Sequence, residues 1–438
     1  MSRPPPSARG VAVRVLRQVQ QRRGFSNRIL AEQLSESGLD RRDRGLVTTL
    51  VYGVLRHRAR LDALIDSVAR RPAGIKGRAR EILRVAVLEL RELDHPAHAA
   101  ISEAVRGIAM FDRRGALVAV AQAILSRISV EGETLDLSLG SGKPLDVLAR
   151  RWSVPRWLAG RWIKRLGPER AELRARAMAE PPSLDLRIDC GQMSAEQVAE
   201  ILRTEVGASV STVVGQGQAL RVRGGGALSE HRLFRAGVFS IQALGSQQPA
   251  LLLKACAGER ILDACAGMGT KTLQLAEMMG RRGTIVAADR SILRLDEQVG
   301  LATRGGLCRE ELDLRIVSGD LRDELEGVDD GPLFDGVLLD APCTGLGNLG
   351  RHPELRFVRE FADLAACVQL QRQLLEACWR RVRSGGRLVY AVCSLEPEEG
   401  EVLVASVAAE HGLRVALERT WTPEEEGCDG FYVARIEA

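Results

Sequence analysis

From about residue 236 onward, the chain alternates short apolar strands with helices, and this alternation constrains the fold more than any other feature. Strands are expected at Arg260–Cys265, Thr284–Asp289, Leu314–Asp320, Phe334–Asp340 and Gly386–Ser394. Helices are expected from Thr270, from Ser291, around Leu364–Val382 and from Pro397. The run from Gly336 to Leu339 is apolar without alternation, as a strand covered on both faces requires. The order predicts a doubly wound, Rossmann-like α/β domain that closes with a strand over Gly430–Ile436.

The front of the chain, residues 1–132, has the periodicity of helices instead. Apolar residues recur at helical spacing in Arg9–Gln21, Asp43–Val54, Arg60–Val68, Arg78–Leu93, Ile101–Phe111 and Ala116–Ile128. This pattern predicts an all-α bundle of six or seven helices. Residues 131–143 contain Gly132, Gly140 and Gly142 without periodicity, so a linker is expected there.

Residues 133–235 are expected to hold linker helices and a small mixed α/β unit. Pro144–Ala179 has a helical pattern, Ser183–Ile188 alternates like a strand, Ser194–Val206 has the period of a helix, and Ala219–Val222 alternates again. The predicted organisation is therefore a helical domain at 1–132, linker helices with a small α/β unit at 133–235 and a doubly wound α/β domain at 236–438.

The charge of the 438-residue chain is concentrated at its front. Residues 1–130 carry 24 Lys and Arg against 12 Asp and Glu, which is a net +12, whereas the remainder carries a net −7. A basic front favours a polyanionic partner such as RNA, although a basic helical face is also an ordinary solvated surface. The sequence has no apolar run of membrane-spanning length and no secretory signal pattern, so we expect a soluble, cytoplasmic protein without a membrane partner.

The nine cysteines show neither Cys-x-x-Cys pairs nor the Cys/His spacing of a zinc site. We therefore expect no metal and no disulfide framework, in agreement with a reducing compartment.

A glycine-containing loop follows the first expected strand of the α/β domain, at the edge where such folds bind nucleotides. It consists of Cys265, Ala266, Gly267, Met268, Gly269, Thr270 and Lys271. Glycines let a backbone turn sharply and approach a ligand. A dinucleotide fingerprint needs a third glycine where Thr272 stands, and a Walker loop needs glycine in place of Thr270. The loop therefore favours a cofactor that brings no phosphate group to it.

Acidic residues end three successive strands, at Asp289, Asp320 and Asp340. We expect Asp289 to accept both ribose hydroxyls of an adenosine and Asp320 to accept from an adenine amino group. Helix capping is the alternative for Asp289, which lies two residues before an expected helix. Together with the glycine loop, the three acids favour a pocket for S-adenosyl-L-methionine over one for NAD or ATP.

Two cysteines, Cys343 and Cys393, come just after expected buried strands at the same edge. Carbon 5 of cytosine is a poor nucleophile, but a thiolate that adds to C6 makes C5 reactive enough to accept a methyl group. Such chemistry needs a thiol with a lowered pKa under the ring and an acid at N3. Asp340 and Cys343 are expected to supply the acid and one thiol, and Cys393 the other. Buried structural roles are expected for Cys256, Cys265, Cys308, Cys367, Cys378 and Cys428.

These motifs resemble the Sun/NOP family of RNA cytosine-5 methyltransferases. The matching runs are Asp-Ala-Cys-Ala at 263–266, Asp-Ala-Pro-Cys-Thr-Gly-Leu-Gly at 340–347, Arg-His-Pro-Glu at 351–354 and Cys-Ser-Leu-Glu-Pro-Glu-Glu at 393–399. The front of the chain resembles a NusB-type RNA-binding bundle, through residues 27–30, 52–56 and 95–105. The combination is characteristic of the bacterial RsmB branch, which modifies 16S ribosomal RNA.

The resemblance implies a class I methyltransferase that uses S-adenosyl-L-methionine on free or partly assembled 16S rRNA, as a monomer. It implies Cys393 as the nucleophile and links Cys343 to product release. The related DNA enzymes use the Pro-Cys thiol instead, so the assignment of the two cysteines stays open to test. It also implies a cofactor loop at 265–271 and a pocket lined by Asp289, Asp320 and Asp340.

The chain departs from the family pattern in its cofactor loop, where Gly267-Met268-Gly269-Thr270-Lys271 replaces the usual Ala-Pro-Gly-Gly-Lys. This departure is the only support for one alternative, a non-catalytic RNA-binding factor in ribosome assembly. Cytosine methylation of another RNA, such as tRNA, is a second alternative. An NAD-linked oxidoreductase is disfavoured because the third glycine is missing.

Overall fold

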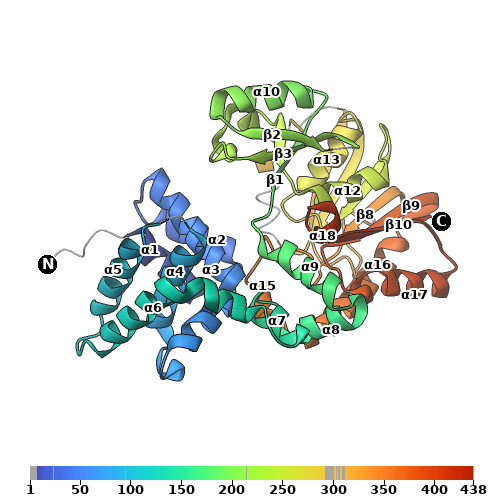
Figure 1. Cartoon of the computed structure of the whole chain (residues 1–438). Coiled ribbons are helices and arrows are strands. Elements are labelled where there is room, and N and C mark those ends of the chain that lie inside the picture. Colours follow the sequence, from blue (N-terminus) through green and yellow to red (C-terminus); the bar gives the residue numbers. More distant parts are fainter. Residues whose placement is uncertain are drawn as a thin grey trace. The chain divides into compact units, whose positions relative to one another are not determined.

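The computed structural model describes residues 7–437 except residues 23, 94, 214, 292–299, 302, 304–305 and 308–310. The chain folds into two compact units, which are drawn together in Figure 1. Unit 1 comprises Met1–Glu180 and Leu349–Glu360, and unit 2 comprises Pro181–Asn348 and Phe361–Ala438. A short segment from the second half of the sequence thus belongs to the first unit. Within the described residues, no helix combines the length and apolar character needed to cross a bilayer.

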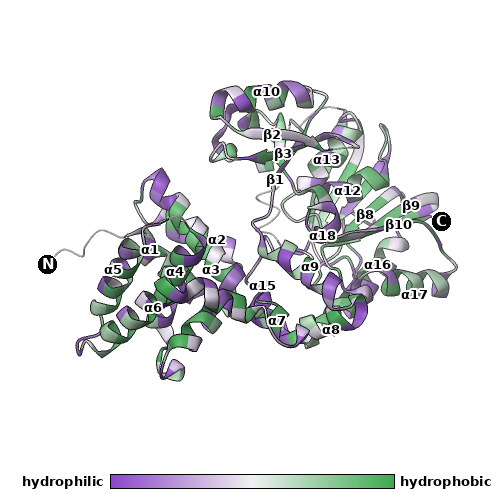
Figure 2. Cartoon of the chain, viewed as in Figure 1, coloured by the Kyte–Doolittle hydropathy of each residue, from purple (hydrophilic) through white to green (hydrophobic). Residues whose placement is uncertain are grey.

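Unit 1 begins with the expected helical bundle. Its helices are α1 (Ala8–Arg22), α2 (Ser26–Ser35), α3 (Arg41–Val68), α4 (Gly77–Glu92), α5 (Ala97–Ala109) and α6 (Ala116–Leu139), with a short 3-10 turn at Pro72–Gly74. Their apolar stripes meet in one core that includes Val11, Leu50, Leu83 and Leu125. Figure 2 shows hydrophobic and hydrophilic residues alternating around these helices. The two stretches predicted around residue 57 form the single helix α3, bent at His57.

The predicted linker at residues 131–143 is largely wrong, because α6 continues to Leu139 and ends at Gly140. Gly132 lies inside this helix, where an added Cβ would come within 2.8 Å of the Arg91 guanidinium. A glycine in a helix interior costs about 1 kcal/mol relative to alanine, but tertiary contacts override that preference here. Asp136 supplies such contacts by accepting from Arg60 and Arg91.

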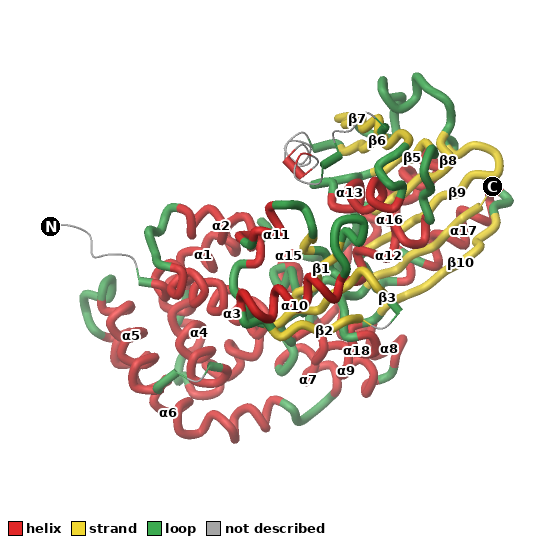
Figure 3. The backbone as a smooth tube through the Cα atoms, turned by 90° about the horizontal axis from the view of Figure 1, so that it is seen from above, coloured by secondary structure: helices red, strands yellow, loops and turns green. Residues whose placement is uncertain are grey.

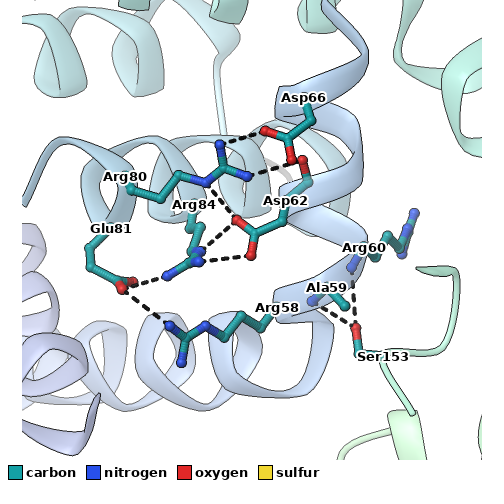
Figure 4. Close-up of polar contacts among 9 residues, drawn as sticks. All are labelled: Arg58, Ala59, Arg60, Asp62, Asp66, Arg80, Glu81, Arg84 and Ser153. Carbon is teal, nitrogen blue, oxygen red and sulfur yellow. Dashed lines mark hydrogen bonds and ion pairs between the residues drawn. The ribbon is translucent and has the colours of Figure 1, made fainter. Parts of the chain in front are cut away.

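Many arginines of the bundle pair with acids of the same unit. Figure 4 shows Arg80 and Arg84 donating to Asp62, with Arg80 also reaching Asp66. Glu81 receives Arg84 and lies 3.9 Å from Arg58. These guanidinium groups hold α3 and α4 together. The total of 24 Lys and Arg in residues 1–130 therefore overstates the number of basic side chains that are available to an RNA.

The rest of unit 1 consists of α7 (Pro144–Arg150), α8 (Arg156–Leu166), α9 (Pro168–Ala179) and α15 (Leu355–Val358). Segment 349–360, which contains α15, is held by buried polar contacts. Glu354 accepts from the Ser26 backbone N–H at 3.2 Å and from Ser26 Oγ at 2.7 Å. Arg356 is buried and donates to the carbonyl oxygens of Trp152 and Met178. The Arg-His-Pro-Glu motif at 351–354 thus belongs to the contacts of the helical unit.

Unit 2 begins with a small antiparallel sheet of order β2-β3-β1-β4. Its elements are β1 (Leu184–Ile188), α10 (Ala195–Val206), β2 (Ser209–Val213), β3 (Gln216–Arg223), a 3-10 turn (Leu228–Glu230), α11 (Arg232–Arg235) and β4 (Phe239–Ile241). Ser194 caps α10 in a capping box with Gln197, which explains where that helix starts. Apolar residues of α10 pack on the sheet, among them Val198 and Leu202.

The larger sheet has seven strands in the order β10-β11-β9-β8-β5-β6-β7 (Figure 3). They are β5 (Arg260–Ala264), β6 (Gly283–Asp289), β7 (Leu312–Ser318), β8 (Phe334–Asp340), β9 (Val382–Val392), β10 (Arg414–Trp421) and β11 (Phe431–Glu437). Strands β5 to β9 pair in parallel, whereas β11 pairs antiparallel with β9 and β10. The doubly wound Rossmann-like prediction is confirmed, with an antiparallel addition at one edge.

Helices cover both faces of this sheet. Leu338 of β8 packs in a core with α12 (Leu244–Leu253) and α13 (Thr270–Met278). Its neighbours Val337 and Leu339 pack in a second core with α16 (Phe361–Trp379) and α17 (Glu401–His411). Burial on both faces is what the unbroken apolar runs predict. The helix expected from Ser291 falls largely on residues 292–299, outside the described residues.

Candidate active site

Three neighbouring strands bring the predicted chemistry to one edge of the larger sheet. Cys393 directly follows β9, Asp340 is the last residue of β8, and the loop 265–271 follows β5. Parallel pairing aligns these ends, with Asp340 opposite Ala391 and Ala264 opposite Leu339. Because the carboxyl ends of parallel strands meet at a common edge, residues far apart in the sequence converge there.

The two predicted thiols lie next to each other. The sulfur atoms of Cys343 and Cys393 are 3.3 Å apart, within hydrogen-bonding distance for sulfur, and both residues are partly exposed. The hydrogen bond to Cys393, with burial second, raises the pKa of Cys343 well above its usual value. Either sulfur can be the donor in this contact, and the raised pKa of Cys343 favours its protonated form.

The side chain of Lys271, the last residue of the glycine loop, contacts Asp340. Its ammonium donates to Asp340 Oδ2 at 2.6 Å and to Ser246 Oγ at 3.0 Å. Burial lowers the pKa of Lys271, but the charge and hydrogen bond of Asp340 outweigh burial and raise it overall. Lys271 is thus a fixed cation at the edge that carries the thiols, and its charge also interacts with Cys393.

The glycine loop adopts backbone conformations that explain its composition. Cys265, Gly267 and Gly269 all have positive φ angles, of 60°, 59° and 82°. Left-handed backbone favours glycine, so two of the three positions are occupied by the residue suited to them. Ala266 N–H donates to the carbonyl of Ala288 at 2.9 Å, which ties the loop to β6.

Asp289 supports this loop and also caps the chain after β6. One oxygen accepts from Gly267 N–H at 2.9 Å, and the other accepts from Ser291 N–H at 2.8 Å. Asp320 lies two residues beyond β7, not at its end, and receives the guanidinium of Arg322 at 2.6 and 2.9 Å. This pairing lowers the pKa of Asp320 to about 2. Asp289 is therefore close to the loop, while Asp320 already has a cationic partner.

Asp263, the first residue of the Asp-Ala-Cys-Ala run at 263–266, is fully buried near the end of β5. Its Oδ2 accepts from Thr272 Oγ1 at 2.6 Å, whereas its Oδ1 has no hydrogen-bond partner among the described residues. Burial raises the pKa of Asp263 to about 7. The oxygen without a partner is itself buried, so Asp263 faces the interior beneath the loop and contacts Thr272 there.

The other cysteines have less uniform surroundings than predicted. Cys378 is buried, as expected, and burial raises its pKa to about 12. Cys256 is exposed, so a buried role is wrong for it. It lies in the turn before β5, where its backbone N–H donates to Glu259. Cys308 lies outside the described residues.

Two polar residues of the site were not singled out from the sequence. Ser246, in α12, shares the Lys271 ammonium with Asp340, and no local pattern marks it. Glu399 is buried beneath the two thiol loops. It belongs to the Cys-Ser-Leu-Glu-Pro-Glu-Glu run, so the motif contained the residue without indicating what it does.

Comparisons with known proteins match both halves of the chain. The family described as 16S rRNA methyltransferase RsmB/F matches residues 250–437, and the NusB family matches residues 6–129. These matches confirm the NusB-like and methyltransferase folds that the resemblance implied.

Curated relatives align over nearly the whole length of both proteins. The probable ribosomal RNA small subunit methyltransferase B of Synechocystis sp. is 32% identical, over 98% of this chain and 99% of the relative. The ribosomal RNA small subunit methyltransferase B of Pseudomonas putida is 33% identical, over 97% of each. The crystal structure of PH0851 has a TM-score of 0.79 at 23% identity and covers 100% of both chains, which shows a common fold.

Proposed function

This chain belongs to the family of the ribosomal RNA small subunit methyltransferases B, and from that membership we propose that it methylates C5 of a cytosine in 16S rRNA. The methyl donor proposed is S-adenosyl-L-methionine. The observation that carries the proposal is the pair of sulfur atoms 3.3 Å apart, at the sheet edge that also holds Lys271, Asp340 and the glycine loop.

The residues around the glycine loop fit this cofactor. Asp289 is close to the loop and has the acceptor capacity for ribose hydroxyls, since each carboxylate oxygen accepts more than one hydrogen bond. Met268, in the same loop, is exposed. Asp263 lies two residues before the loop, and its buried Oδ1 has no hydrogen-bond partner among the described residues. Bound there, the cofactor supplies an electrophilic methyl group on a sulfonium. Loop residues 265–271 with Asp289, Asp320 and Asp340 are the proposed binding set.

Cys393 is the proposed nucleophile. Its sulfur forms a bond to C6 of the cytosine, and the electrons of the C5–C6 double bond move to C5, which then accepts the methyl group. A base, assigned in this proposal to a solvent water, then takes the C5 proton. The electrons of the C5–H bond restore the C5–C6 double bond, and the sulfur of Cys393 leaves C6 with the bonding pair. The first step requires a thiolate on Cys393, and the charge of the nearby Lys271 ammonium interacts with this residue.

Asp340 and Lys271 are proposed to serve the opposite edge of the ring. Negative charge develops toward N3 when the thiolate adds to C6, and a fixed, partly buried cation stabilises such charge more than water does. In this proposal the carboxyl group of Asp340 donates a proton to N3 as the thiolate adds, and the Lys271 ammonium, 2.6 Å from Asp340, stabilises the carboxylate that results.

Cys343 is proposed to act in product release. Because its pKa is raised, it holds its proton and donates a hydrogen bond to the sulfur of Cys393. A donor at that position stabilises the thiolate that leaves C6 at the end of the reaction. Removing Cys343 then slows release more than attack.

The division of labour along the chain is part of the same proposal. Residues 1–132 and 133–235 bind rRNA, and residues 236–438 carry the chemistry. In the same proposal, the protein acts as a monomer in the cytoplasm, on free or partly assembled 16S rRNA.

A direct test is transfer of labelled methyl from S-adenosyl-L-methionine to 16S rRNA isolated from cells that lack this protein. Bisulfite sequencing then locates any 5-methylcytosine. The proposal expects one site in 16S rRNA and none after Cys393→Ala. Label in tRNA alone would replace the substrate, and no label together with intact RNA binding would favour a non-catalytic assembly factor.

A further inference from the structure

Glu399 is a buried acid near the two thiols whose carboxylate accepts four hydrogen bonds. It is 0% exposed and lies at the end of a short 3-10 turn, Pro397–Glu399. One oxygen accepts from Thr344 N–H at 2.8 Å and from the Gln371 amide at 2.9 Å. The other accepts from Ser394 Oγ at 2.5 Å and from Thr344 Oγ1. All the partners of Glu399 in these contacts are therefore donors. A carboxylate accepts hydrogen bonds and donates none, so the donors match it.

The donors come from the residues that directly follow the two cysteines. Thr344 follows Cys343, and Ser394 follows Cys393, so one carboxylate joins both thiol loops. The Glu399 backbone is fixed as well, because its carbonyl accepts from the Tyr390 hydroxyl at 2.7 Å within the strand that leads to Cys393.

Two further contacts tie the same loops together without reaching the thiols. Gly347 N–H donates to the Cys393 carbonyl at 3.0 Å, and Gln371 also donates to the Pro342 carbonyl at 2.9 Å. Gly347 has no room for a side chain, since an added Cβ would stand 2.2 Å from the Gly430 carbonyl oxygen. The two loops are thus packed as one body, with Glu399 at its polar centre.

We propose that Glu399 is a positioning residue for the thiol pair: its carboxylate fastens the Cys343 loop to the Cys393 loop and keeps both sulfur atoms within reach of one substrate carbon. The inference rests on the proposed function, in which one thiol attacks and the other assists release. A displacement of about 1 Å in a reacting group can lower a rate by about 100-fold. Loosening the link between the two loops should therefore lower kcat.

The negative charge of Glu399 also affects the two thiols, in addition to the position of its carboxylate between their loops. After the hydrogen bond to Cys393 and burial, its negative charge is one of the causes that raise the pKa of Cys343. The Lys271 cation interacts with Cys393 instead. The site thus has an anion beside the thiol that keeps its proton and a cation beside the thiol that attacks.

The main test replaces Glu399 by Gln and by Asp in the full-length protein. Gln turns one acceptor oxygen into an NH₂ group that faces two donors, whereas Asp keeps the charge on a shorter side chain. We expect Glu399→Gln to lower kcat about 10- to 100-fold and to leave KM for S-adenosyl-L-methionine within about twofold. Glu399→Asp should recover part of kcat. Glu401→Gln removes an exposed acid two residues along and is the matched control.

A second readout measures the thiol pair without catalysis. Diamide oxidises two adjacent thiols to a disulfide, while its azo bond takes up the two protons and two electrons. We expect the Cys343–Cys393 disulfide to form more slowly in Glu399→Gln than in the unmodified protein or in Glu401→Gln. Mass spectrometry of tryptic peptides identifies the bond.

Smaller changes keep the test decisive if Glu399→Gln does not fold. Thr344→Val and Ser394→Ala each remove one hydroxyl donor and should each lower kcat with KM for the cofactor unchanged. Unaltered kcat and unaltered disulfide formation in folded Glu399→Gln, or in both smaller variants, would overturn the inference. Failure of the unmodified protein to methylate any RNA would instead overturn the proposed function.

Discussion

The Lys271 ammonium, in the first turn of α13, lies 2.6 Å from the Asp340 carboxylate at the end of β8. The strands that precede the two residues, β5 and β8, are hydrogen-bonded neighbours in the sheet. The register of the parallel sheet therefore sets this ion pair. In the proposed mechanism this cation acts on both the cofactor loop and the thiol pair, which makes Lys271 the first residue to test.

Replacing Lys271 by Met should lower kcat about 100- to 1,000-fold, because Met keeps the buried stem but removes the charge that stabilises the transition state. Lys271→Arg should restore little, since the planar guanidinium does not replace a compact ammonium held between Asp340 and Ser246. Transfer of labelled methyl at saturating RNA measures both. Lys254→Met is the control, because Lys254 is exposed and precedes β5, at the end of the sheet where the parallel strands begin. Equal loss in Lys254→Met would contradict a specific role.

The two thiols should give opposite results. Cys393→Ala should form neither 5-methylcytosine nor a covalent complex, because it lacks the attacking sulfur. Cys343→Ala should accumulate a protein–RNA adduct that survives denaturing electrophoresis, because release loses its hydrogen-bond donor. Cys256→Ala, at an exposed cysteine, should behave like the unmodified protein. An adduct in Cys393→Ala would transfer the nucleophile role to Cys343.

Most of the larger sheet was predictable because its signals are local. Unbroken apolar runs marked β5, β6 and β8, and glycines marked the loop after β5. Strand β10 was not predicted, since five consecutive residues from Leu417 to Trp421 include two charged side chains and all but the last are exposed. Exposed, charged strands at a sheet edge protect it from pairing with other chains, and they lack the apolar pattern that identifies interior strands.

The contacts that organise the site depend on tertiary structure instead. No local rule connects Glu399 to Thr344, which precedes it by 55 residues, or Ser26 to Glu354, which follows it by 328. The position of Lys271 in the glycine loop can be read from the sequence, but the direction of its side chain follows from the pairing of β5 with β8. The identity of each residue can be read from the sequence. The hydrogen-bond partners at the carboxyl ends of the strands depend instead on the register with which the strands pair.

Glu354 offers a test of the segment that joins the helical unit from the second half of the chain. Burial works against its ionisation, but hydrogen bonds from His352 and Ser26 outweigh burial and lower the pKa of Glu354. Glu354→Ala leaves buried donors unpaired and should destabilise the protein by about 1–3 kcal/mol. Urea unfolding followed by circular dichroism measures the loss. Ser26→Ala and the double variant complete a cycle, and additive losses would show that the two residues do not interact.

Asp263 makes a prediction about pH and stability. An unfolded aspartate titrates near 3.9, whereas burial raises the pKa of folded Asp263 to about 7. The folded state therefore holds this proton more tightly, so the stabilising effect is complete below about pH 4 and is lost as the pH rises toward 7. Asp263→Asn cannot ionise and keeps an acceptor for Thr272. Its free energy of unfolding, relative to that of the unmodified protein, should rise between pH 4 and 7 by up to about 4 kcal/mol. Urea midpoints at pH 4.5, 5.5, 6.5 and 7.5 measure this difference, and parallel pH profiles for the two proteins would show that Asp263 ionises normally in the fold.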